Sequence, residues 1–163
     1  MSEGLKKSIT ETFSKLNEVL SSFSEMNKPE ANNSWTVGQI AEHLTISNLV
    51  IIKTLNGTSE TVERSSDEKV QVIKDFFLDF PTKMKAPDFI QPSSNPQIKA
   101  DILVSIQNIK NEFLEIAEMQ NLELICLDFE IPTFGKFTKY EWVWWAIFHT
   151  QRHIYQLGKL KVN

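Results

Sequence analysis

The stretch KYEWVWWAIFHTQRHIYQL, residues 139–157, decides both the fold class and the chemistry that we expect. Apolar side chains recur in it every three or four residues, which predicts a long helix with one buried face. Thr138 stands just before it and Glu141 follows three residues later, a capping-box pattern that places the helix start at about Thr138. We expect the helix to end near Gly158.

Two of the chain's three histidines, His149 and His153, lie four positions apart in this stretch. An α-helix turns about 100° per residue, so the two side chains lie about 40° apart on one face. This spacing lets both imidazoles reach one metal ion, as the paired histidines of zinc metalloproteases do. Trp142 and Trp145 share the face and make it mainly apolar, so we expect it to point into the protein.

The third histidine, His43, lies in WTVGQIAEHL, residues 35–44, at the margin of another apolar stripe. It should therefore also point towards the interior of the protein or lie along the edge of the buried face. A third imidazole from a facing helix would complete a three-histidine site with coordination positions open to water, the pattern of catalytic metal centres. The alternative is three unrelated core or surface histidines, because a lone buried histidine is more often a hydrogen-bonded core residue than a ligand.

The helical period also predicts long helices over about residues 5–27 and 97–120, and from Ser34 or Thr36 to NGTSE at residues 56–60. Four long amphipathic helices with short or irregular links predict an all-α four-helix bundle. The side chains that should face its core in the first three helices are Leu5, Ile9, Phe13, Leu16, Leu20, Phe23, Val37, Ile40, Leu44, Ile51, Leu55, Ile98, Ile102, Ile106, Ile109, Phe113 and Ile116.

The middle of the chain, residues 57–97, is the least regular part, and we expect it to shape the mouth of a pocket. Within it, SSDEKVQVIKDFFLDF predicts a short helix capped by Ser66 or Asp67, followed by a proline-rich loop. Further on, LELICL at residues 122–127 either extends the third long helix or forms a short extended piece.

The composition excludes several functional classes. The 163 residues fit a single domain, residues 1–163, that can bury a core without disulfides. A net charge of −4 without a basic cluster argues against nucleic acid as a partner, and we find no stretch long enough to enter a membrane. Cys126 is the single cysteine and the N-terminus lacks the apolar core of a signal peptide, so we expect a cytoplasmic protein.

The residues around the histidines resemble the signature regions of the DinB/YfiT-like superfamily. Its members show Trp-Ser/Thr before Glu/Ala-His-Leu, then a Pro-x-Phe-Gly turn and a last helix with His-x-x-Arg-His-x-x-Gln. The resemblance spans about residue 5 to the end of the chain. The positions that carry it are Trp35, Thr36, His43, Pro132, Phe134, Gly135, His149, Arg152, His153 and Gln156.

The resemblance implies an up-down-down-up bundle with a long irregular connection between its second and third helices. It also implies a divalent metal, zinc or nickel, held by His43, His149 and His153, and a homodimer. Nitrogen ligation alone would equally suit copper or iron. Candidates for lining a pocket beside the metal are Gln156, Arg152, Trp142 and Ser47.

The superfamily includes thiol-dependent S-transferases and metal-dependent hydrolases, so the resemblance implies an enzyme that acts on a small-molecule substrate. A metal lowers the pKa of a bound water, which favours hydrolysis, or of a low-molecular-weight thiol, which favours S-transfer. The competing hypothesis is a non-catalytic helical binding domain with a structural or vestigial metal site.

The residues near the histidines argue against two known kinds of metal site. Thr150 stands where a zinc metalloprotease carries its general base, and Glu-x-x-His does not occur, which argues against a carboxylate-bridged di-iron site. We expect Glu42 to point away from His43 into solvent, and Cys126 to be an inert packing residue, since apolar surroundings raise the pKa of a thiol.

Overall fold

The computed structural model describes residues 2–162, and helices dominate that part of the chain. The α-helices are α1 (Ser2–Ser21), α2 (Val37–Leu55), α3 (Val70–Leu78), α4 (Lys99–Met119) and α5 (Lys139–Val162). The shorter elements are the 3-10 helices η1 (Ala31–Asn33) and η2 (Asp88–Ile90) and the strands β1 (Ser59–Glu60) and β2 (Ile125–Cys126). The prediction of a mainly helical protein is confirmed.

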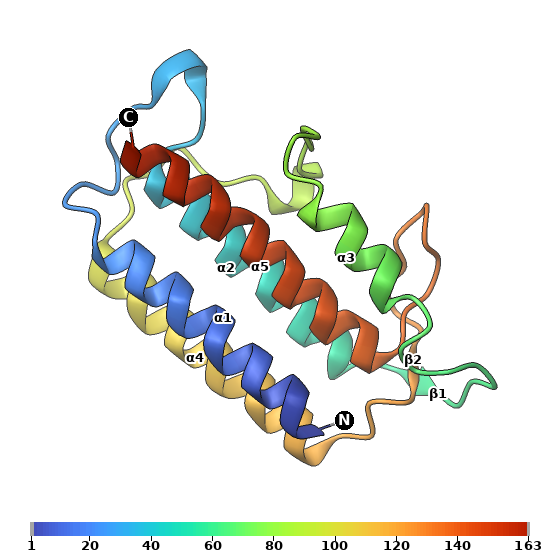
Figure 1. Cartoon of the computed structure of the whole chain (residues 1–163). Helices are drawn as coiled ribbons and strands as arrows, with labels where there is room; N and C mark the ends of the chain where they lie inside the picture. The colour runs from blue at the N-terminus through green and yellow to red at the C-terminus, as the bar shows by residue number, and fades with distance from the viewer. Residues whose placement is uncertain (1, 163) are drawn as a thin grey trace.

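The four long helices pack side by side, and each contacts two of the others. Around the bundle the order is α1, α4, α2, α5, so α1 lies diagonally opposite α2, and α4 diagonally opposite α5, whereas α2 and α4 are neighbours. Figure 1 shows α1 and α5 running one way along the bundle, and α2 and α4 running the other way. Helix α3 lies outside this group and packs on α5.

The predicted apolar stripes form the core of the bundle, with two exceptions. Ile98 is 64% exposed because it precedes the first turn of α4, and Phe23 is only partly buried because α1 ends at Ser21. Lys99 Nζ donates to the carbonyls of Ser21 and Phe23, at 2.6 and 2.8 Å. A lysine at this end of a helix satisfies free carbonyls and complements the helix dipole, so a residue of α4 fixes the end of α1.

A capping box starts α2, as the sequence indicates. Thr36 Oγ1 accepts a hydrogen bond from the Gln39 amide at 3.1 Å, and Gln39 Oε1 accepts one from the Thr36 amide at 3.0 Å. Each side chain therefore satisfies one amide that the helix itself leaves free. Thr36, and not Ser34, is the cap.

Three predicted helix boundaries are wrong. Helix α1 ends at Ser21 and not at about residue 27. Neither Ser66 nor Asp67 caps α3, which starts after Lys69 without a side-chain cap. Helix α5 continues through Gly158 to Val162, and Lys159 and Lys161 suit the last turn of a helix.

The segment LELICL at residues 122–127 does not extend α4; it contains the short strand β2. β2 pairs with β1 in antiparallel register, with Ser59 opposite Cys126 and Glu60 opposite Ile125. The turn that follows reverses the chain at Gly135, whose φ of 71° lies in the left-handed region that favours glycine. This turn leads directly into α5.

Glu141 anchors the start of α5, the helix that carries two histidines. Its fully buried carboxylate accepts two hydrogen bonds from Arg64, at 2.6 and 2.7 Å, and one from the Lys69 amide at 2.8 Å. The Thr138 amide donates to the same carboxylate at 2.9 Å, which completes the predicted capping box. The network joins the segment between β1 and α3 to the first turn of α5.

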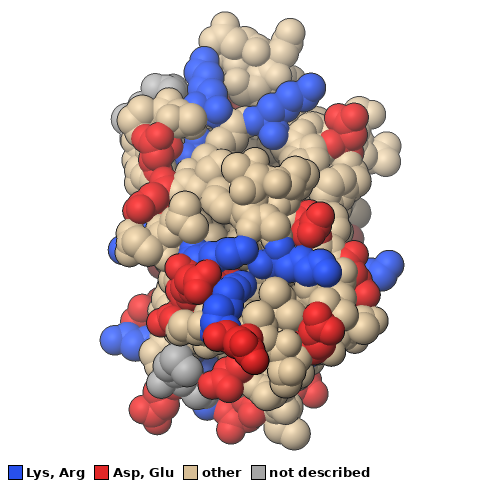
Figure 2. All heavy atoms as spheres, turned by 90° about the vertical axis from the view of Figure 1, so that its right-hand side faces the viewer, with Lys and Arg blue, Asp and Glu red and all other residues tan. Residues whose placement is uncertain are grey.

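The face of the protein on the α3 side carries both signs of charge, with uncharged surface between them (Figure 2). Among the helices of residues 2–162, none combines the length and the apolar character that crossing a membrane requires.

Candidate metal centre

The three histidines meet between α2 and α5. His149 Nε2 lies 3.1 Å from His43 Nε2 and 3.1 Å from His153 Nε2. All three side chains are buried, with exposed fractions of 2%, 7% and 8% for His43, His149 and His153. The structure therefore brings together the three histidines that the sequence analysis selected, although His43 lies more than a hundred positions before the other two.

Two of the nitrogen separations match those of ligands on one divalent metal ion, and all three nitrogens lie within 4.8 Å of one another. Zinc binds histidine nitrogen at about 2.0–2.1 Å, so two nitrogens 3.1 Å apart subtend an angle of about 100° at such an ion. That angle suits a tetrahedral site and lies within reach of an octahedral one. Three neutral imidazoles also match the ligand chemistry of zinc and nickel, whereas a site for magnesium or calcium would present oxygens.

Two of the rings are held through their other nitrogen. His43 Nδ1 lies 2.8 Å from the carbonyl oxygen of Ile90, at the end of η2, and His153 Nδ1 lies 2.8 Å from Gln156 Oε1. His149 Nδ1 is buried and has no hydrogen-bond partner among the described residues.

Aromatic side chains form the walls around these rings. Trp35 lies against His43 with ring centroids 4.9 Å apart, and Phe77 of α3 lies against His149 at 5.1 Å. Phe77 in turn packs edge-on against Trp145 at 4.6 Å. These walls exclude water, so charges inside the site interact strongly.

The environment keeps all three histidines neutral. Burial is the main cause that lowers the pKa of His43, lowers that of His149 well below its usual value, and lowers that of His153 to about 3. The neighbouring imidazoles and Arg152 lower the pKa of His149 and His153 further. Because metal ligation requires neutral imidazole, the unliganded site is already in the required protonation state at neutral pH.

We expect the metal-free protein to lose stability as the pH falls from about 7.5 to about 5. In the unfolded chain the histidines take up protons near pH 6.5, whereas in the folded state they do so only at lower pH, at about 3 for His153. Their contribution to stability is therefore complete above pH 6.5 and declines below it. Urea unfolding of chelator-treated protein across this range measures the loss.

The matched control is His153→Gln, which removes one of the titrating groups. This variant is expected to show a smaller dependence of the unfolding free energy on pH than the wild type. A wild-type protein whose stability does not change across this range would contradict the neutral, buried state of the histidines.

Four further residues were predicted to line a pocket, and the structure gives each a defined place. Gln156 contacts His153, and Ser47 Oγ donates to the His43 carbonyl at 2.7 Å. Trp142 is 1% exposed and packs with Phe129 and Phe137. Contact of these side chains with a substrate remains a prediction.

The fourth of these residues, Arg152, forms hydrogen bonds with the end of α3. Its guanidinium donates to the carbonyls of Phe77 and Asp79, both at 3.0 Å, and to that of Thr82. The end of α3 leaves the Phe77 and Asp79 carbonyls without helical partners, Thr82 lies in the loop beyond it, and one guanidinium binds all three carbonyls. Arg152 thereby holds Phe77 against His149.

Two features of the site were not predicted from the sequence. The expectation that Glu42 is solvated is wrong: its half-buried carboxylate accepts hydrogen bonds from the Ser93 amide at 2.8 Å and from Ser93 Oγ at 3.0 Å. The Ile90 carbonyl was also missed, because any residue supplies a carbonyl and only the fold places one. Glu42 adjoins His43 in the sequence, which is the one signal that could have pointed to it.

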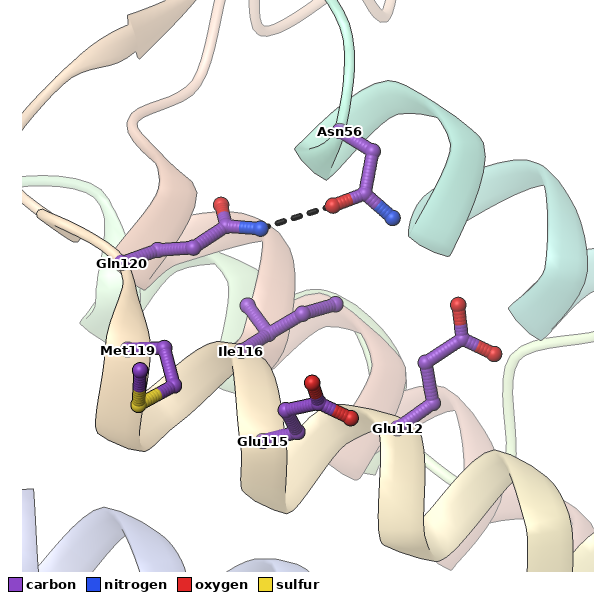
Figure 3. Close-up of a pocket in the computed structure, with 6 residues that line it drawn as sticks. All are labelled: Asn56, Glu112, Glu115, Ile116, Met119 and Gln120. Atoms are coloured by element: carbon purple, nitrogen blue, oxygen red, sulfur yellow. Dashed lines mark hydrogen bonds between the residues drawn. The ribbon is translucent and has the colours of Figure 1, made fainter.

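A separate small cavity of about 160 Å³ lies between the end of α2 and the last turns of α4 (Figure 3). Gln120 Nε2 donates to Asn56 Oδ1 at 2.7 Å across it. Pockets for small ligands measure about 300–1,000 Å³, so this cavity is too small for a typical substrate. Its lining residues are Asn56, Glu112, Glu115, Ile116, Met119 and Gln120.

Cys126 lies in β2, fully buried, and burial raises the pKa of its thiol to about 11.

We expect a thiol reagent at about pH 8 to modify the native protein at least 100-fold more slowly than the urea-unfolded chain, because the thiolate is the reactive form. Equal reaction rates in the native and unfolded states would contradict the prediction that Cys126 is an inert packing residue. The rate is measured from the absorbance of the released chromophore.

Comparison with known proteins gives one match. The family model described as the DinB superfamily matches residues 8–157. No curated protein and no solved structure gives a significant match.

Proposed function

Because this chain belongs to the DinB superfamily, we propose that it binds one divalent metal ion through His43, His149 and His153 and uses it on a small-molecule substrate. The observation that carries the proposal is the convergence of three neutral, buried Nε2 atoms from two helices. Zinc and nickel are the proposed metals.

The chemistry that we propose is S-transfer from a low-molecular-weight thiol, or hydrolysis. A bound metal would supply the positive charge that lowers the pKa of a thiol or a water molecule. The residues around the site would strengthen this effect of the metal in two ways. The three imidazoles add no charge that would oppose this effect, and Trp35 and Phe77 exclude bulk water from it.

We also assign the helix order to the up-down-down-up bundle that the sequence resemblance implies. The directions of α1, α2, α4 and α5 in Figure 1 support this assignment. The long connection between α2 and α4 contains α3 and η2, and it supplies both Phe77 and the Ile90 carbonyl to the site.

Metal content and turnover together test the proposal. Untagged protein purified without chelator should contain close to one metal ion per chain. A screen of thiol transfer and of ester and amide hydrolysis should then find a turnover that metal removal abolishes and that His153→Ala lacks. A folded wild-type protein that takes up neither zinc nor nickel would overturn the proposal.

The second candidate is a binding domain in which the metal is structural. The low exposure of the three histidines, at most 8%, favours it, because a substrate needs access to the metal. This candidate predicts the same metal content but no metal-dependent turnover in the same screen.

A further inference from the structure

We propose that Gln156 and the Ile90 carbonyl are positioning groups that fix His153 and His43 in the tautomer whose Nε2 lone pair faces the metal. The proposal rests on the proposed function, because it concerns residues that hold the ligands of that site. Gln156 acts through its side chain, whereas the Ile90 carbonyl is held in place by Glu42.

The tautomer follows from what each Nδ1 atom faces. A carbonyl oxygen can only accept, so His43 Nδ1 must donate to Ile90, which leaves Nε2 unprotonated. His153 Nδ1 likewise donates to Gln156 Oε1 at 2.8 Å, and its Nε2 also carries a lone pair. Both lone pairs point towards His149 Nε2, which can donate to only one of them. A cation satisfies all three nitrogens together.

The Ile90 carbonyl lies in the irregular segment between α3 and α4, and a second set of contacts holds this segment over His43. Glu42 accepts hydrogen bonds from the amide and the hydroxyl of Ser93, three residues after Ile90. Gln39 Nε2 donates to the Ser93 carbonyl at 3.1 Å. Because Glu42 and Gln39 belong to α2, the helix that carries His43 also fixes the carbonyl that orients it.

His149 differs from its two partners, since its Nδ1 has no hydrogen-bond partner among the described residues. Its ring is held by packing against Phe77, which the contacts of Arg152 keep in place. The orientation of the site by hydrogen bonds therefore depends on two groups, one from α5 and one from the segment that follows α3.

The first test replaces Gln156 with methionine, which keeps the length of the side chain but offers no amide oxygen. Competition against a chromophoric chelator should show zinc affinity reduced by about 10–100-fold, the usual effect of losing such a partner. Gln156→Glu retains an acceptor oxygen and should bind zinc at least as tightly as the wild type. Gln151→Met is the matched control, because Gln151 on the same helix bonds Thr12 instead.

A packing role would give a different pattern. Zinc affinity in Gln156→Met that equals that of the wild type and of Gln151→Met would overturn the proposal for Gln156. Equal losses in Gln156→Met and Gln156→Glu would also overturn it, since the glutamate retains the acceptor. The absorption spectrum of bound cobalt supplies a second readout, because it should change in Gln156→Met and remain close to that of the wild type in Gln156→Glu.

The second test replaces Glu42 with alanine, beside Glu115→Ala as an exposed control on α4. We expect faster amide hydrogen exchange around Ser93 and a loss of zinc affinity of about 10-fold, at the lower end of the usual range. Faster exchange with unchanged affinity would overturn the role of Glu42. A wild-type protein that binds no zinc would instead overturn the proposed function itself, so the two failures are distinguishable.

Discussion

Replacing His149 with alanine is expected to weaken zinc binding by more than about 100-fold, because losing even an outer partner of a ligand costs about 10–100-fold. His149 Nε2 lies 3.1 Å from each of the other two nitrogens, so its removal leaves His43 and His153 without the shared neighbour that completes the site. Isothermal titration of the metal-free protein measures the affinity directly.

The same variant should lose the stabilisation that zinc gives to the wild type. Free zinc at about 100 times its Kd stabilises the folded state by about 2.7 kcal/mol. For a chain of this length, that corresponds to a rise in Tm of about 5–10 °C. Comparing each protein with and without zinc separates this effect from any change in the packing of α5. Stoichiometric zinc bound with wild-type affinity by His149→Ala would contradict the three-histidine site.

Replacing Glu141 with alanine is expected to lower the free energy of unfolding by about 3 kcal/mol, the lower end of the usual range for removing one partner of a buried ion pair, because the Arg64 side chain is 17% exposed. The carboxylate is fully buried, and its removal leaves the Lys69 and Thr138 amides without their acceptor. Arg64 loses its charged partner but keeps the Ser65 and Lys136 carbonyls. Urea denaturation measures the change, and an unaltered dependence of the unfolding free energy on urea would show that the unfolded state is unaffected.

An exposed ion pair provides the control for this prediction. Lys6 and Glu118 also pair across two helices, but Glu118 is 59% exposed and Lys6 33% exposed, and a solvated pair of this kind contributes little. Glu118→Ala is therefore expected to unfold at the same urea concentration as the wild type. A change in Glu141→Ala that is no larger than that of the control would show that the network does not anchor α5.

The sequence predicted helix faces and starts better than helix ends. Apolar spacing reports which side of a helix is buried, and the pairs Thr36 with Gln39 and Thr138 with Glu141 act locally, so both are readable from the chain. The end of α1 depends on Lys99, which lies in another helix. No local pattern contains that information.

The same distinction applies to the candidate site. The three histidines were found because residue type and helix face together predict where each side chain points. Their surroundings were not found, because Phe77 and the Ile90 carbonyl come from a connection without a regular period. The sequence placed Arg152 among the candidates beside the metal, but its partners at the end of α3 depend on how α3 packs.

The order of helices around the bundle has a consequence for how fast the chain folds. The extensive interfaces between described helices join α1 to α4 and α5, α2 to α4 and α5, and α3 to α5. The consecutive long helices α2 and α4 are in contact but run in the same direction (Figure 1), so no two consecutive long helices form an antiparallel hairpin. The chain must therefore lose the entropy of closing long loops before these interfaces can form and stabilise it. Folding rates fall as the contacts become less local. We expect this protein to refold more slowly than a bundle of the same size built from successive helix hairpins.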